Sequence, residues 1–127
     1  IAIIDSNKVN LNAPSVKYDY MYLNSVVEFG LNETKNHLID DVKRLSHPKA
    51  KVANKFVVHL YRISGEGNDK ISQRDWSPNS KRFISPKEIF IYVKDTDVEV
   101  YLGVFDCTGN YPTGIWKINK LGVTKIR

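Results

Sequence analysis

The clearest pattern in the chain is an alternation of apolar and polar residues, which is typical of half-buried β-strands. It is strongest at 98–105, where every second residue from Val98 to Val104 is apolar. A β-branched and aromatic run at 89–93 precedes it, and the residues between the two have turn chemistry. The pattern therefore predicts a β-hairpin over 89–105. Other strand-like stretches occur at about 16–29, 56–63, 115–119 and 121–126.

One segment has helical spacing instead. Its apolar residues follow the spacing i, i+1, i+4 and i+7, which lines one side of a helix: Leu38, Ile39, Val42 and Leu45. Asn32 is placed to cap the first turn, and Pro48 prevents continuation. The sequence predicts one amphipathic helix over about 33–46.

About six short strands with a single early helix favour a mainly β fold. No regular alternation of strands and helices is evident, which disfavours doubly wound and barrel α/β folds. We therefore expect a two-sheet antiparallel β-sandwich of the transthyretin or immunoglobulin-like kind, forming one domain over 16–127. Residues 1–15 are rich in Asn, Ser and Asp and are expected to be a flexible N-terminal tether.

Composition limits the function more than it defines it. The chain has 127 residues and a formal net charge of +5, which suits one small domain. No apolar run approaches the roughly 20 residues of a membrane-spanning helix. The basic residues are dispersed and lack an accompanying basic-aromatic motif, so nucleic acid is not expected as a partner. A small nucleic-acid-binding β-domain is the weakest alternative, and it rests on the isoelectric point of 9.3 alone.

The residues that could carry chemistry are scattered. The histidines at 37, 47 and 59 lie 10 and 12 positions apart, without the close pair that zinc sites usually show. The single cysteine, Cys107, has no neighbouring base or helix start in sequence, and we expect a half-buried structural side chain. Because no nucleophile, metal or phosphate motif is present, we predict no catalytic, cofactor or metal site and no enzymatic activity.

Four short segments, in order, resemble the outer-membrane lipoprotein of type VI secretion systems, the TssJ family. The strand pattern Val57–Ile63 is similar to the family's Val-x-Val-x-x-Tyr-x-Leu strand. Ser85-Pro86-Lys87-Glu88 stands where the family has Pro-Gly-Glu before a hydrophobic strand, with Lys87 in place of the glycine. Tyr101-Leu102-Gly103-Val104 and Trp116-Lys117 match the two strand motifs that follow.

This resemblance implies a non-catalytic β-sandwich in the periplasm. It would be anchored to the outer membrane by a lipid on an N-terminal cysteine that precedes residue 1 and is not in this chain. Its partner would be the periplasmic part of an inner-membrane secretion subunit, TssM. The family's contact loop corresponds here to the helix and the loop up to residue 55, which gives candidate partner-binding residues: His47, Pro48, Lys49 and Lys51.

A second class of function stays open. The segment from Asp106 to Ile118 is similar to bacterial immunoglobulin-like modules. The chain would then be another secreted or periplasmic binding domain, either an immunity or inhibitor protein or a module of a larger surface protein.

Overall fold

A computed structural model describes residues 1–9, 21–31, 33–63, 84–107, 109 and 113–127. The protein is mainly β, and its six strands form one mixed sheet in the order β1-β2-β3-β4-β5-β6. Two neighbouring pairings, β2 with β3 and β3 with β4, are parallel, whereas β1/β2, β4/β5 and β5/β6 are antiparallel. The strands are Ala2–Val9, Met21–Leu31, Asn54–Ile63, Val98–Asp106, Gly114–Asn119 and Gly122–Lys125.

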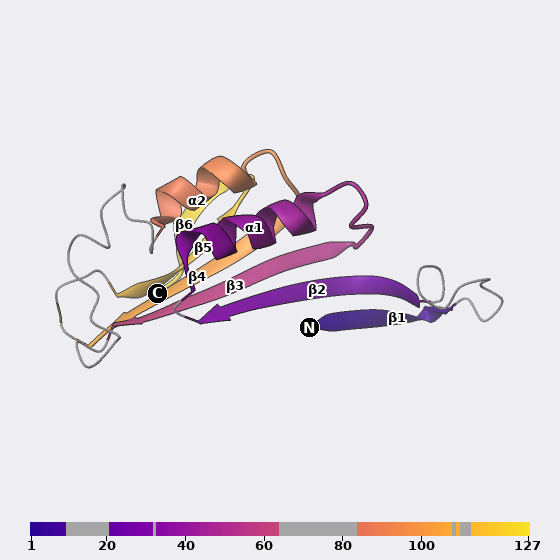
Figure 1. The fold of residues 1–127 in the computed structure, drawn as a ribbon, viewed down its shortest axis with the longest axis horizontal. Coiled ribbons are helices and arrows are strands. Elements are labelled where there is room, and N and C mark those ends of the chain that lie inside the picture. The colour runs from indigo at the N-terminus through magenta and orange to yellow at the C-terminus, as the bar shows by residue number, and fades with distance from the viewer. Residues whose placement is uncertain (10–20, 32, 64–83, 108, 110–112) are drawn as a thin grey trace.

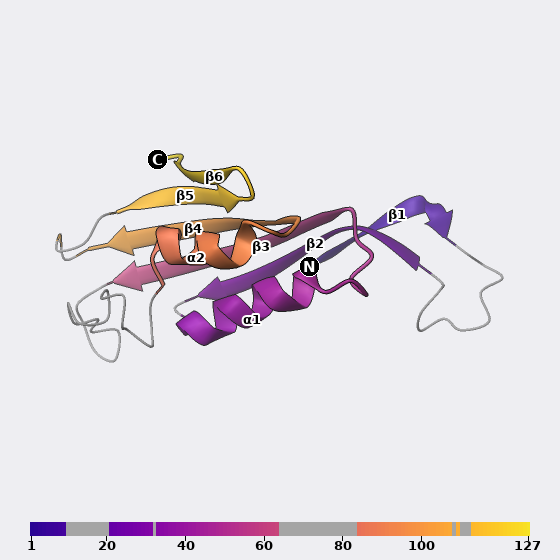
Figure 2. The ribbon, with the colours of Figure 1, turned by 90° about the horizontal axis from the view of Figure 1, so that it is seen from above.

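Two helices connect the parallel strands. Helix α1, Lys35–Ser46, lies between β2 and β3 in the chain, and helix α2, Pro86–Val93, lies between β3 and β4. Figures 1 and 2 show both helices on the same face of the sheet. Because the strand order advances in one direction from β2 to β4, crossovers of the same hand place both helices on that face.

The predicted amphipathic helix is confirmed as α1. Its four predicted apolar positions are buried, and it begins two residues later than expected. The N-cap is Thr34, whose hydroxyl accepts a hydrogen bond from the backbone N–H of His37 at 3.3 Å. Lys43 and Arg44 lie in the last turn, where positive charge is favourable.

The predicted strand at 89–93 is wrong, because this segment belongs to α2. A capping box starts the helix: the Ser85 hydroxyl accepts from the backbone N–H of Glu88, whose carboxylate accepts from the backbone N–H of Ser85. Pro86 occupies the first turn, where its missing N–H is harmless. The hairpin predicted over 89–105 is therefore absent, and only its second strand, β4, forms.

The expectation of a two-sheet sandwich is also corrected. The described residues form one open sheet, and β2-α1-β3-α2-β4 is a parallel β/α unit that the sequence pattern did not reveal. Parallel neighbours need long crossover connections, and here these contain α1 and α2, which occupy the side where a second sheet would lie. Within the tether predicted at 1–15, Ala2–Val9 forms strand β1, which pairs with β2, and residues 10–15 lie outside the described part.

The hydrophobic core lies between the sheet and the two helices. Its strand residues all come from one face of the sheet, and its helix residues come from the sides of α1 and α2 that face it. The fully buried members include Leu38, Val42, Val57, Tyr61, Ile84, Ile89, Val93, Val100, Leu102, Val104 and Ile118. The face of the sheet towards the helices is therefore buried in the hydrophobic core.

Candidate interaction surface

On the opposite face of the sheet, the described strands carry many exposed apolar side chains. Side chains alternate between the faces of a strand, so the neighbours of Val57 and Tyr61 point away from the helices. The strand register aligns them in rows, such as Phe29, Val58 and Tyr101 on β2, β3 and β4. We call this side the open face, defined by its apolar residues: Ile3, Val27, Phe29, Leu31, Phe56, Val58, Leu60, Tyr101, Phe105 and Ile115.

Many of these side chains contact solvent. The exposed fraction is 64% for Leu31, 57% for Phe29, 53% for Ile3, 44% for Phe105 and 37% for Leu60. The other five members are partly exposed. Both helices lie on the other side (Figures 1 and 2), and no described helix or strand covers the open face. A contiguous apolar patch of this kind on a small domain is typical of an interaction site.

A glycine allows two of these side chains to lie flat on the sheet. A Cβ at Gly103 would stand 2.7 Å from Cδ2 of Leu60 and 3.2 Å from the ring of Phe105. Gly103 pairs with Leu60 in the register of β3 and β4, and Phe105 follows two residues later on the same face. Because Gly103 has no side chain, the side chains of Leu60 and Phe105 can occupy the space above its backbone.

The open face is polar at the end where the parallel strands begin. The carboxylate of Glu99 accepts hydrogen bonds from Tyr101 at 2.6 Å and Asn119 at 3.1 Å, and it pairs with Lys117 at 2.8 Å. Burial alone raises the pKa of Glu99, but the bonds from Lys117, Tyr101 and Asn119 outweigh it, so the pKa is lowered. The carboxylate and the ammonium group neutralise each other on this surface.

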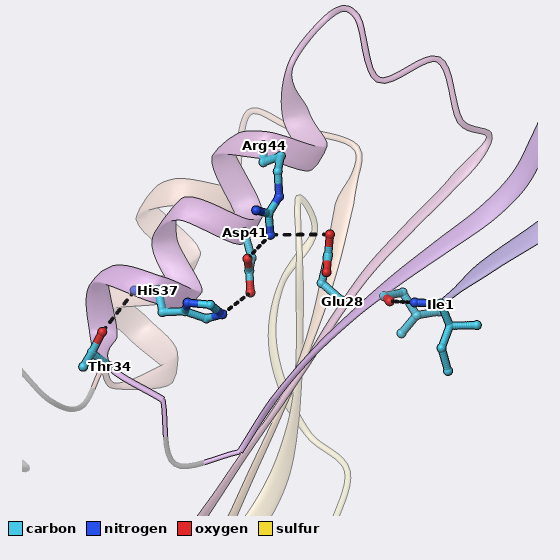
Figure 3. A network of polar contacts seen from close by, with 7 residues as sticks. Ile1, Glu28, Thr34, His37, Asp41 and Arg44 are labelled. Atoms are coloured by element: carbon cyan, nitrogen blue, oxygen red, sulfur yellow. Dashed lines mark hydrogen bonds and ion pairs between the residues drawn. The ribbon is translucent and has the colours of Figure 1, made fainter. Parts of the chain in front are cut away.

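A second polar cluster lies on the helix side, between α1 and β2 (Figure 3). Asp41 is buried on α1, and its carboxylate contacts the guanidinium of Arg44 and the ring of His37, the latter at 3.4 Å. Arg44 also reaches Glu28 on β2 at 3.4 Å. Burial raises the pKa of Asp41 although His37 and Arg44 oppose it. The contacts link α1 to the sheet, and they give the cluster a structural role.

His59 is the most deeply buried polar side chain in the described part of the chain. It is fully shielded from solvent beside Gly30, and its ring lies 4.5 Å from that of Tyr61. Within the described residues, neither ring nitrogen makes a hydrogen bond of normal geometry. Burial, with a smaller contribution from His37, lowers the pKa of His59 to about 4. The ring is therefore a neutral core side chain at physiological pH.

This shift predicts a pH-dependent stability. Since the folded-state pKa lies below the ordinary 6.5, the unfolded chain binds a proton first. The contribution of His59 is fully present above pH 6.5 and is lost as the pH falls towards 4. Between pH 7 and pH 5 we expect a loss of about 2 kcal/mol in the free energy of unfolding. Urea unfolding of the wild type and of His59→Leu at both pH values measures it, and equal losses in the two proteins would contradict it.

The predicted partner-binding residues lie together in the loop between α1 and β3. His47, Pro48, Lys49 and Lys51 are all exposed. His47 is the C-cap of α1, and its Nδ1 accepts a hydrogen bond from the backbone N–H of Lys49 at 3.1 Å. None of the four belongs to the open face. Cys107, expected to be half-buried, is exposed.

Sequence reasoning missed the open face, although a signal for it was present. The strand at 56–63 is apolar in consecutive positions, as in Val57-Val58 and Leu60-Tyr61, rather than only in alternate ones. Such a run indicates a strand with apolar side chains on both faces. The sequence did not show that the helices cover only one of these two faces.

No family model, curated protein or solved structure matches the chain. Among the described residues, no group of three or more potential metal ligands comes together. No helix in the described ranges is long and apolar enough to cross a membrane.

Proposed function

We propose that the chain is a non-catalytic protein-binding module and that the open face is its contact surface. The observation that carries the proposal is the set of five exposed apolar side chains, Ile3, Phe29, Leu31, Leu60 and Phe105, on the sheet face that no described helix or strand covers. A partner that covered these side chains would gain about 25 cal/mol of binding free energy for each Å² of apolar surface removed from water.

The strand arrangement supports the same function. Parallel strands are usually covered on both faces, because both carry apolar side chains. Here α1 and α2 cover one side of β2, β3 and β4, and none of the elements in the described ranges covers the other. A partner on the open face would complete the layered arrangement that these strands favour.

Photocrosslinking in the cells that make the protein tests this function. A photoreactive amino acid at Leu60 should give a discrete adduct with a protein. The same amino acid at Ile91, which is 61% exposed on α2, is the matched control and should not. The proposal would be refuted by the absence of an adduct at Leu60, or by the same adducts from both positions.

A second candidate follows from the resemblance to the type VI secretion lipoprotein. It places the module in the periplasm, attached to the outer membrane by a lipid, with a TssM-like secretion subunit held by the loop of His47, Pro48, Lys49 and Lys51. The exposure of this basic loop supports it. Three of the resembling segments lie on the neighbouring strands β3, β4 and β5, but the fourth begins α2 instead of preceding a strand.

The two candidates give different crosslinking results. Contact through the loop predicts adducts from a photoreactive amino acid at Lys49 rather than at Leu60. It also predicts a lipid-modified cysteine upstream of residue 1 in the precursor. Adducts at Leu60 alone would exclude the loop as the main contact.

A further inference from the structure

We infer that the partner of the open face is the open face of a second copy of this chain. The inference rests on the proposed function and adds the identity of the partner. The two sheets would pack face to face, with the helices of each copy on the outside.

The area of the open face is close to what a stable dimer needs. At about 200 Å² for a side chain of this size, the five most exposed residues alone offer roughly 500 Å². The five partly exposed members raise this to roughly 700 Å². Stable interfaces bury about 800 Å² on each partner, so one copy supplies nearly the whole contact.

The shape of the surface favours a sheet as the occupant. Twisted sheets pack face to face at about 10 Å, with their strands within about 30° of each other. The apolar residues extend over β1 to β5 as a broad surface rather than along one narrow line, which is too wide for a single helix to cover. A second copy presents the same broad sheet, and a twofold axis brings identical patches together.

The charges also allow self-association. A surface that meets its own copy places like charges near each other, and the net charge of +5 opposes association in general. On the open face, however, Lys117 and Glu99 are already paired with each other at 2.8 Å. Arg62, which pairs with Phe105 in the strand register, is an exposed positive side chain on the same face. Other lysines, such as Lys43 on α1, Lys87 on α2 and Lys94 after it, belong to the helix side of the molecule.

Thiol labelling combined with sedimentation tests the inference. In a Cys107→Ser background, Leu31→Cys places a single thiol on the open face, and Ile91→Cys places one on the outer side of α2 as the matched control. Labelling by a charged thiol reagent is followed across a dilution series, and the mass of each protein is measured at the same concentrations. Circular dichroism confirms that each variant is folded.

Self-association predicts a doubled mass at high concentration and labelling of Leu31→Cys about tenfold or more slower there than at high dilution. Ile91→Cys should be labelled at one rate throughout. Adding Phe29→Asp should keep the protein monomeric, because the dimer would bury an unpaired charge.

The experiment distinguishes failure of the dimer inference from failure of the proposed function. A monomer with fast labelling of Leu31→Cys at every concentration overturns the second copy but leaves the face free for another protein. A dimer with fast labelling shows that a different surface associates, and it also overturns the inference. A monomer with slow labelling at every dilution means that the chain covers its own open face, which overturns both the inference and the proposed function.

Discussion

Shortening Leu102 to alanine is expected to lower the free energy of unfolding by about 3–4 kcal/mol, whereas Leu60→Ala lowers it by about 1 kcal/mol. Leu102 is fully buried between the sheet and the helices, and its removal leaves a cavity that the packed neighbours cannot fill. Leu60, on the adjacent strand, is 37% exposed on the open face, where water takes the place of the lost atoms.

Urea unfolding of the two variants at low protein concentration measures this difference, because association then adds nothing to stability. The slope of the unfolding free energy against urea should stay close to that of the wild type in both variants. The substitution is chemically the same, so only the environment differs. Equal losses at Leu102 and Leu60 would mean that both faces of the sheet are buried within one chain.

Gly30→Ala is expected to destabilise the protein by about 2–3 kcal/mol through a clash with His59. A Cβ at this position would lie 2.5 Å from Nδ1 and 2.8 Å from Cε1 of the imidazole ring. The ring is fully buried and packs against Tyr61. The strand or the ring must therefore move away from its packed position.

A double-mutant cycle isolates this contact. In a His59→Ala background the ring is absent, so adding Gly30→Ala should cost less than about 1 kcal/mol. Gly103→Ala in the wild type is the comparison on the open face, where the nearest atom belongs to the flexible, partly exposed side chain of Leu60. Gly103→Ala should lower the free energy of unfolding clearly less than Gly30→Ala does. The explanation is wrong if Gly30→Ala costs the same with and without the His59 ring.

Local periodicity predicts the elements whose environment is simple. Helix α1 has one apolar side and clear end signals, and β4 alternates because one of its faces is buried and the other is not. These patterns depend on nearby residues alone, and both elements were predicted from the sequence. The mainly β character follows from the same alternation.

The prediction from sequence was wrong where hydrophobic periodicity does not decide between a strand and a helix. Ile89–Val93 is a short apolar run rich in β-branched and aromatic residues, which is ambiguous between strand and helix. The capping box Ser85-Pro86-Lys87-Glu88 decides it, because it starts a helix three residues before the run. With α2 assigned as a strand, a parallel connection between β3 and β4 could not be inferred.

No single residue in the sequence indicates the open face. Phe29 on β2, Leu60 on β3 and Phe105 on β4 are ordinary strand residues in sequence, and the sheet order brings them together. The candidate residues in the loop of Lys49 and Lys51 came instead from the resemblance to the type VI secretion lipoprotein, whose contact loop corresponds to this segment. An apolar surface of this kind is visible only after the helices are known to occupy the other face.

The accessibility of single methyl groups to a soluble paramagnetic agent tests the central claim most directly. At a concentration at which the chain is monomeric, the methyl groups of Leu31 and Leu60 should relax several times faster than those of Leu38 and Leu102. That result would show water over the open face and none in the core. Relaxation of Leu31 and Leu60 as slow as that of Leu38 would show that the open face is covered within the chain, and would contradict the account.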